Sequence, residues 1–320
     1  MPIEPTILTL LADIRDIEPR AAASSAEARR AAMAGAHDAL LSQVPAYPSF
    51  PDVDVTERTV VSGGRAIPVR VFTPAGSGPF PAYLFFFGGA WWQRSFDAGD
   101  IVDACAHAAQ EGRAVVIEVD YRLAPEHPYP AALDDAAAVL QWISDAADDL
   151  GIDTRRIAVG GQSSGGNLAA ALCLRNRDED GPEIGLQILE VPALTLDRAV
   201  DAPRLDTAVE SDEESGFPEA IRYYLSGDPV AALDPYVSPL LADDVSGLPE
   251  ALILTAEHDV LRNEALRYAA RLANAGVPTT AVTYAGQVHF TPALRTLTPS
   301  GRAWRGQVAQ ALRDFGAVTR

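Results

Sequence analysis

Three side chains that could together carry out nucleophilic catalysis occur along this chain, and the first of them is Ser163. It lies in residues 161–165 (GQSSG), between a short apolar run and an alanine-rich stretch. The G-x-S-x-G pattern between a strand and a helix is typical of a tight turn that lifts a serine hydroxyl above the edge of a sheet. Side chains at Gly161 and Gly165 would collide across such a turn. A helix beginning after Ser163 would point free N–H groups at the same spot, where an anion could develop. Ser163 is therefore the predicted nucleophile.

A serine hydroxyl needs a base, usually a histidine that a carboxylate holds in place. His289 follows the last predicted strand, and Asp259 follows the strand before it. Catalytic groups collect at these carboxyl ends in open α/β sheets, and the order Ser163, Asp259, His289 is one that hydrolases use. Alternatives remain: Glu257 or His258 could take the role of Asp259, which could instead cap a helix, and His289 could be an ordinary loop histidine.

Backbone N–H groups that could stabilise an oxyanion are expected directly after the predicted strand 83–87, where glycines let a substrate approach closely. The predicted donors are Gly88, Gly89, Ala90 and Ser164. The predicted substrate contacts are the side chains beside them, Phe87, Trp91, Trp92 and Gln162. The alternative is a plain glycine turn after a strand.

Composition excludes several classes of function. The 320 residues contain 48% hydrophobic residues and carry a formal net charge of −19, which predicts a folded domain with neither nucleic acid nor an anionic membrane as partner. The chain has no lysine, which excludes a P-loop lysine, a Schiff base and an S-x-x-K acyl-enzyme. No histidine pair has zinc-ligand spacing and no strand leads into G-x-G-x-x-G, so we expect no metal and no cofactor.

The remaining compositional signals concern the compartment and the surface. Cys105 and Cys173 are expected to be buried free thiols in a reducing compartment. The N-terminal residues lack a signal-peptide pattern and no apolar run is long enough to span a membrane, so a cytoplasmic protein is expected. The acidic pair Asp134 and Asp135 is expected on a solvated face.

Strands and helices are predicted to alternate through most of the chain. The predicted strands are residues 53–61, 67–72, 83–87, 114–120, 156–161, 186–191, 251–256 and 280–284. The predicted helices are residues 7–14, 21–41, 97–110, 131–145, 164–177, 217–225, 263–275 and 303–315. The first two strands form an antiparallel hairpin, and the later ones are continuous apolar runs, as in a parallel sheet buried on both faces. The fold class is therefore α/β, with a mostly parallel, doubly wound sheet.

Two regions stand outside this alternation and are expected to form a helical cap. Residues 1–50 contain the two N-terminal helices and precede any strand. Residues 195–238 are rich in acidic residues and proline and interrupt the alternation after a central strand. We predict one hydrolase core over residues 51–320, with cap helices from residues 1–50 and a cap insertion at about 195–238.

The chain resembles the bacterial hormone-sensitive-lipase-like carboxylesterases of the α/β-hydrolase superfamily. The most specific match is residues 120–135 (DYRLAPEHPYPAALDD), and residues 236–240 (YVSPL) and 286–290 (GQVHF) also match. The resemblance implies Ser163 as nucleophile, Asp259 as the orienting acid, His289 as the base, a helical cap, and often a homodimer through the last strand and its neighbouring helix. This chain departs from the family at Phe87 and Ala90, where the oxyanion loop usually reads His-Gly-Gly-Gly. It departs again at Gln162 and Ser164, where the elbow often has aspartate and alanine.

These observations predict a serine hydrolase of small to medium acyl esters that works through an acyl-enzyme. A lactonase, an amidase or a natural-product hydrolase with the same triad is the second reading, and the altered oxyanion loop motivates it. A more distant reading is a non-catalytic small-molecule receptor, as in the plant gibberellin receptor, which resembles the family but lacks the catalytic histidine. The presence of all three triad residues argues against it.

Overall fold

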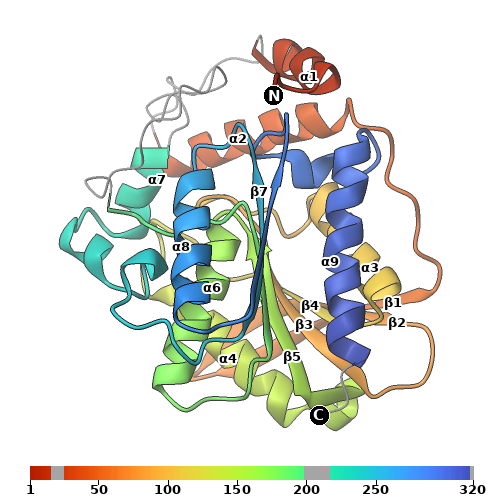
Figure 1. Cartoon of the computed structure of the whole chain (residues 1–320), viewed down its shortest axis with the longest axis vertical. Coiled ribbons are helices and arrows are strands. Elements are labelled where there is room, and N and C mark those ends of the chain that lie inside the picture. The colour runs from red at the N-terminus through yellow and green to blue at the C-terminus, as the bar shows by residue number, and fades with distance from the viewer. Residues whose placement is uncertain (16–24, 198–216, 318–320) are drawn as a thin grey trace.

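One mixed sheet of eight strands forms the centre of the molecule in a computed structural model that describes residues 1–15, 25–197 and 217–317 (Figure 1). Its strand order is β1-β2-β4-β3-β5-β6-β7-β8. The strands are β1 (Val53–Ser62), β2 (Arg65–Pro74), β3 (Phe80–Phe86), β4 (Val115–Val119), β5 (Ile152–Gln162), β6 (Leu186–Glu190), β7 (Glu250–Ala256) and β8 (Thr279–Tyr284). The pairings of β2 with β1 and with β4 are antiparallel, and all other neighbours are parallel. All eight strands were expected from the sequence, and so was the mostly parallel arrangement.

The burial of each strand follows from its place in the sheet. Every residue of β3, β4 and β6 is buried, because helices cover both faces of the central strands. The edge strands β1 and β8 have several exposed positions. The continuous apolar runs in the sequence therefore mark the centre of the sheet.

Helices cover the two faces of the sheet. The helices of the core are α3 (Gly99–Gly112), α4 (Ala131–Asp145), α5 (Ala147–Leu150), α6 (Ser164–Asp178), α8 (Arg262–Asn274) and α9 (Pro299–Ala317). Figure 1 shows α3 and α9 on one side of the sheet, with α4, α6 and α8 on the other. The doubly wound arrangement is thus present. The sequence did not predict the short α5 or the 3₁₀ turns Val230–Leu233, Pro239–Leu241 and Thr291–Leu294.

Three further helices, α1 (Pro5–Arg15), α2 (Ala26–Leu41) and α7 (Phe217–Tyr224), lie together at one end of the molecule (Figure 1). Ser25 caps α2 by accepting a hydrogen bond from the N–H of Ala28, which sets the start of this helix later than the expected residue 21. Buried side chains of α1 and α2, Ile7 and Leu40 among them, share a small apolar cluster with Val288 and Leu294. The N-terminal helices therefore pack on the loop after β8. Residues 198–216 of the expected cap insertion lie outside the described residues.

Residues 120–135, which carry the most specific family resemblance, contain an ion pair that holds two elements together. Asp135 is fully buried, which corrects the expectation of a solvated acidic pair. Its carboxylate accepts two kinds of hydrogen bond from Arg122, one from the backbone N–H (3.0 Å) and others from the guanidinium (2.8–3.1 Å). The ion pair fixes the loop after β4 to the N-terminal part of α4, and a bidentate arginine pair of this kind tolerates burial.

Candidate active site

Ser163 lies in a strained turn between β5 and α6. Its φ is +54° and its ψ is −116°, a combination that non-glycine residues rarely adopt and that is typically found at functional sites. The turn is held from both sides, because the Ser163 N–H donates to the carbonyl of Glu190 (2.8 Å) and the Ser163 carbonyl accepts from the N–H of Asn167 (3.0 Å). The sequence expectation of a serine exposed above the sheet edge by a sharp turn thus has a counterpart in the backbone geometry.

The two glycines of the elbow are required by close packing. A Cβ at Gly165 would lie 2.1 Å from the Phe86 carbonyl oxygen, and one at Gly161 would lie 2.4 Å from the same atom. Such contacts are far inside van der Waals distance. Any larger residue at either position would push β3 and the start of α6 apart, so the turn can form only with glycine at both.

The structure brings Ser163, His289 and Asp259 together. Nε2 of His289 lies 3.0 Å from Oγ of Ser163, and Nδ1 of His289 lies 2.8 Å from Oδ2 of Asp259. The other carboxylate oxygen of Asp259 accepts the N–H of Leu261 at 2.9 Å. Asp259 is buried, with 1% exposure, whereas the His289 side chain is 43% exposed. This arrangement can move a proton from the serine hydroxyl to the imidazole while the buried carboxylate orients the ring.

Glu257 and His258, the two alternatives to Asp259 in the sequence analysis, have other hydrogen-bond partners. Glu257 accepts the N–H of Gly286 at 2.7 Å. His258 lies with its Nε2 2.8 Å from the Met1 carbonyl oxygen. Glu257 thus bonds to the loop after β8 and His258 to the N-terminal residue, whereas Asp259 contacts the His289 ring.

The loop after β3 places backbone N–H groups near Ser163. Within the described chain, the N–H groups of Gly89, Ala90 and Ser164 have no hydrogen-bond acceptor. Gly89 has φ +131° and a Cβ there would lie 2.5 Å from the Gln93 carbonyl oxygen, so this position needs glycine. Ala90 has φ +51°, which an alanine adopts only at a cost of about 1 kcal/mol. The loop therefore keeps a glycine-like backbone at Ala90, where the sequence has lost the glycine.

Phe87 has a packing role where the family usually has histidine. Its side chain is fully buried and its ring stacks on Tyr121 with centroids 4.4 Å apart. The Tyr121 hydroxyl donates to the Phe87 carbonyl at 2.9 Å. Aromatic stacking and one buried hydrogen bond thus hold the start of the loop, in place of polar contacts from a histidine side chain.

The two tryptophans of the loop also point into the protein. Trp91 is fully buried, stacks on Tyr224 at 4.7 Å, and lies with its Nε1 3.3 Å from Oδ1 of Asn167. Trp92 is 5% exposed and packs on Tyr223 at 5.4 Å. Phe87, Trp91 and Trp92 do not line the cavity at Ser163, so the structure does not support the expectation that they contact substrate. The reason is that their loop turns its aromatic side chains toward the core and α7.

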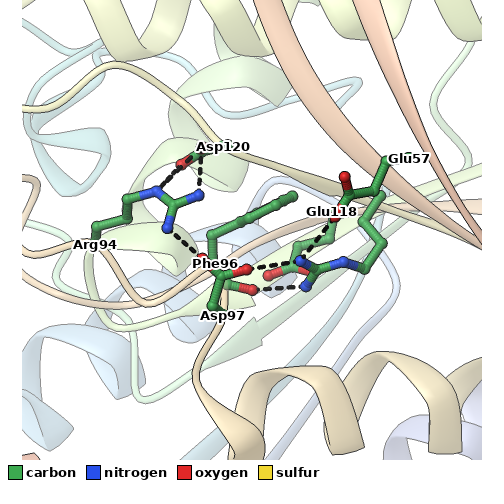
Figure 2. Close-up of polar contacts among 7 residues, drawn as sticks. Glu57, Arg94, Phe96, Asp97, Glu118 and Asp120 are labelled. Atoms are coloured by element: carbon green, nitrogen blue, oxygen red, sulfur yellow. Dashed lines mark hydrogen bonds and ion pairs between the residues drawn. The ribbon is translucent and has the colours of Figure 1, made fainter.

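A network of charged residues anchors the far end of the same loop (Figure 2). Arg70 of β2 donates to the Phe96 carbonyl and to Asp97, both at 2.8 Å, and to Glu118 of β4 at 3.2 Å. Its guanidinium also lies 4.2 Å from the centre of the Phe96 ring. Burial raises the pKa of Glu118, and the positive charge of Arg70 opposes that rise.

A second arginine extends this network to the loop after β4. Arg94 forms a bidentate pair with Asp120, with N–O distances of 2.8–3.1 Å (Figure 2). The segment from Arg94 to Asp97 is thereby tied to both β2 and the end of β4.

A cavity of about 320 Å³ opens beside Ser163. Its lining includes four of the predicted site residues besides the triad, Gly88, Gly89, Ala90 and Gln162. It also includes His37, Gln93, Ser95 and Asp100, which the sequence analysis did not place in the site. No signal in one sequence could have found these four, because the contact between α2 and the start of α3 depends on the tertiary fold.

No group of three or more His, Cys, Asp or Glu side chains in the described part of the chain is placed to hold a metal ion. Among the described helices, none is both long and apolar enough to cross a bilayer. Cys105 and Cys173 are free and buried, as expected.

A mostly parallel sheet with a strained serine after a central strand, and an Asp and a His after later strands, defines an α/β-hydrolase. A family model described as the alpha/beta hydrolase fold matches residues 83–292. Carboxylesterase NlhH of Mycobacterium tuberculosis is 40% identical over 252 residues, which cover 75% of this chain and 76% of that protein. An arylesterase of Saccharolobus solfataricus is 34% identical over 245 residues, covering 76% of this chain and 79% of that protein.

A solved esterase structure has the same fold as this chain. A hyperthermophilic esterase from the archaeon Pyrobaculum calidifontis superimposes with a TM-score of 0.86 at 31% identity, over 99% of this chain and 100% of that one. The chain belongs to the hormone-sensitive-lipase-like family of α/β-hydrolases, as its motifs predicted.

Proposed function

We propose that this protein is a serine carboxylesterase that hydrolyses small to medium acyl esters through an acyl-enzyme on Ser163. The enzyme class is that of the esterases to which most of the chain is similar. The observation that carries the mechanism is the pair of contacts of His289, 3.0 Å from the Ser163 hydroxyl and 2.8 Å from the Asp259 carboxylate.

The proposed mechanism assigns one task to each group. His289 removes the proton of Ser163 as the hydroxyl attacks the ester carbonyl, and Asp259 stabilises the imidazolium that forms. The N–H groups of Gly89, Ala90 and Ser164 donate to the oxyanion. One such donor typically lowers the activation barrier by about 2.7–4 kcal/mol. His289 then gives its proton to the leaving alcohol, and water releases the acyl group by the reverse sequence.

The volume of the cavity and the helices that line it favour small to medium substrates. A volume of about 320 Å³ lies at the small end for ligand pockets, which span roughly 300–1,000 Å³. The cavity lining includes Leu11 of α1, His37 of α2 and Phe217 of α7. We propose that these three helices form the cap that limits acyl length, with Gln162 at the edge of the pocket in contact with substrate.

The proposal is tested by hydrolysis of p-nitrophenyl butyrate by the wild type, Ser163→Ala and Ser246→Ala. Ser246 is exposed and bonds to Asp244, which makes it a matched serine control. We expect Ser163→Ala to lose on the order of 10⁴-fold or more of kcat while Ser246→Ala keeps wild-type rates. Equal rates in wild type and Ser163→Ala would contradict the proposal.

The strained loop at Ala90 favours one second candidate. Ala90 lines the cavity where the family usually has glycine, and its methyl group can change which acyl compounds fit beside the oxyanion donors, so the same triad can serve a lactonase or an amidase. A panel of matched esters, lactones and amides decides between them: faster turnover of the esters excludes the second candidate. A cytoplasmic location and a homodimer remain predictions from the sequence.

A further inference from the structure

The cavity beside Ser163 has one polar wall, whereas ligand pockets are lined predominantly by apolar side chains. This polar wall consists of His37, Gln93, Ser95 and Asp100, all of which line the cavity. Nε2 of His37 lies 3.1 Å from Oδ1 of Asp100. Asp100 is only 7% exposed, so its carboxylate finds its hydrogen-bond partners within the protein and not in bulk water.

Two elements build the polar wall. The helix α2 presents Met33 and His37, which are four residues apart and so lie on one face. The amide nitrogen of Gln93 lies 3.1 Å from the Met33 sulfur, and Asp100 from the first turn of α3 contacts His37. The loop after β3 and the start of α3 therefore face the same side of α2.

The polar wall begins next to the proposed oxyanion donors. The N–H of Gln93 donates to the Gly89 carbonyl at 2.9 Å, and a Cβ on Gly89 would lie 2.5 Å from the Gln93 carbonyl oxygen. Gln93 is therefore one tight turn away from Gly89. A substituent only a few bonds from the reacting ester carbonyl can reach this wall.

The chemistry of His37 indicates what such a substituent should be. With Nε2 taken by Asp100, Nδ1 has no partner among the residues described. Burial lowers the pKa of His37, but the hydrogen bond and charge of Asp100 outweigh it, so the net pKa is raised. The free Nδ1 accepts a hydrogen bond in the neutral ring and donates one in the charged ring. A hydroxyl group can serve both states, whereas a methyl group can serve neither.

We propose that the polar wall is a hydroxyl-binding subsite, with His37 as its specificity-determining residue, so that the preferred substrates are short esters bearing a hydroxyl near the ester group. This inference rests on the proposed esterase function. Asp100 acts as a positioning residue that holds the imidazole, and Gln93 and Ser95 supply further polar contacts.

The test compares two substrate pairs in which a hydroxyl replaces a methyl group. Ethyl 3-hydroxybutyrate against ethyl 3-methylbutyrate places the change on the acyl side, and 2-hydroxyethyl butyrate against propyl butyrate places it on the alcohol side. Hydrolysis is followed by titration of the released acid, and kcat/KM is measured for the wild type, His37→Phe, Asp100→Asn and His127→Phe. His127 is exposed and lies outside the cavity, which makes it the matched control.

We expect the hydroxyl-to-methyl ratio of kcat/KM, in at least one pair, to fall about tenfold in His37→Phe. It should fall by a smaller factor in Asp100→Asn and stay unchanged in His127→Phe. The same ratio in the wild type and His37→Phe for both pairs would overturn the subsite. Equal loss on both members of each pair would show that His37 only supports the fold, and would overturn it too.

Two outcomes separate the subsite from the esterase function on which it rests. If the wild type hydrolyses none of the four esters, the esterase function itself fails. If His37→Phe does not fold, the ratio in Asp100→Asn decides, and an unchanged ratio there counts against the subsite.

Discussion

At the scale of single residues, the imidazole of His289 is the centre of the proposed chemistry, because it contacts both Ser163 and Asp259. These three residues could be predicted from the sequence, since each follows a predicted strand and the carboxyl ends of parallel strands meet at one edge. The side chains of Phe87, Trp91 and Trp92 could not be placed in this way. Their positions depend on a loop with three successive residues at positive φ, from Gly89 to Trp91, and no periodic pattern encodes that.

The buried carboxylate of Asp259 gives the first residue-scale prediction. Replacing it by asparagine preserves its shape but removes the charge that orients and stabilises the imidazolium. We expect Asp259→Asn to lower kcat by on the order of 10³–10⁴, with a melting temperature close to that of the wild type. Steady-state kinetics and a thermal melt measure the two quantities. A variant with kcat within tenfold of the wild type would show that Asp259 does not act on His289.

At the scale of elements, the turn between β5 and α6 makes the sharpest demand on the sequence. A methyl group on Gly165 would lie 2.1 Å from the Phe86 carbonyl oxygen, whereas one on Gly35, exposed within α2, would meet nothing within 4 Å. We expect Gly165→Ala to lower the free energy of unfolding by more than about 2 kcal/mol. The variant should also lose its activity. Gly35→Ala should gain about 0.5–1 kcal/mol because alanine favours the helix.

Urea unfolding of both glycine variants measures these changes. A Gly165→Ala variant as stable and active as Gly35→Ala would contradict this account, because it would show that the turn at Ser163 can accommodate a methyl group on residue 165. This demand could be predicted from the G-x-S-x-G spacing, because a strand followed at once by a helix leaves no other geometry.

The loop after β3 is the second element that must be held in place, and Arg70 is its main anchor. Removing Arg70 alone would leave Glu118 buried without its partner, so we pair the changes. We expect Arg70→Met with Glu118→Gln to lower kcat about tenfold at unchanged KM, because the oxyanion donors lose their position. Glu118→Gln alone keeps the contacts of Arg70 to Phe96 and Asp97 and should retain kcat.

Steady-state kinetics of the single and double variants, with a thermal melt for each, measure this effect. Equal kcat in both variants would show that the network stabilises the sheet without positioning the loop. Nothing in the sequence indicated this network, because Arg70, Glu118 and Asp97 meet only after three separate segments have folded.

At the scale of the whole molecule, most of the architecture could be predicted, because the buried strands are continuous apolar runs and the helices between them are amphipathic. The two N-terminal helices were expected to form a cap, but the contacts that they make could not be predicted. The contacts of α1 and α2 with the loop after β8 join parts of the chain more than 200 residues apart. A homodimer through β8 stays a prediction, and in the described part of the chain β8 lies at the edge of the sheet, next to β7.

The acid stability of the molecule depends in part on His107, which packs edge-on against Phe50. Burial, with help from Arg295 and Arg305, lowers the pKa of His107 to about 4. Between pH 6.5 and 4 the unfolded chain therefore binds a proton that the folded chain does not, so its stability falls as the pH falls through that range. We expect His107→Phe to reduce the loss of unfolding free energy between pH 7 and 4.5 by roughly 1–2 kcal/mol, allowing for partial exposure.

Urea unfolding at the two pH values measures the effect of His107, with the exposed His127→Phe as the control. The same pH dependence in His107→Phe and in the wild type would show that His107 takes up its proton equally in both states.

The most direct test of the proposed chemistry is covalent labelling with a p-nitrophenyl alkylphosphonate, followed by peptide mass spectrometry. A serine activated by His289 attacks phosphorus and expels nitrophenolate, so we expect one stoichiometric adduct on Ser163. The adduct should be absent in Ser163→Ala and should form far more slowly in Asp259→Asn. A wild-type protein that takes up no label, or is labelled on another residue at the same rate in Ser163→Ala, would contradict Ser163 as the nucleophile.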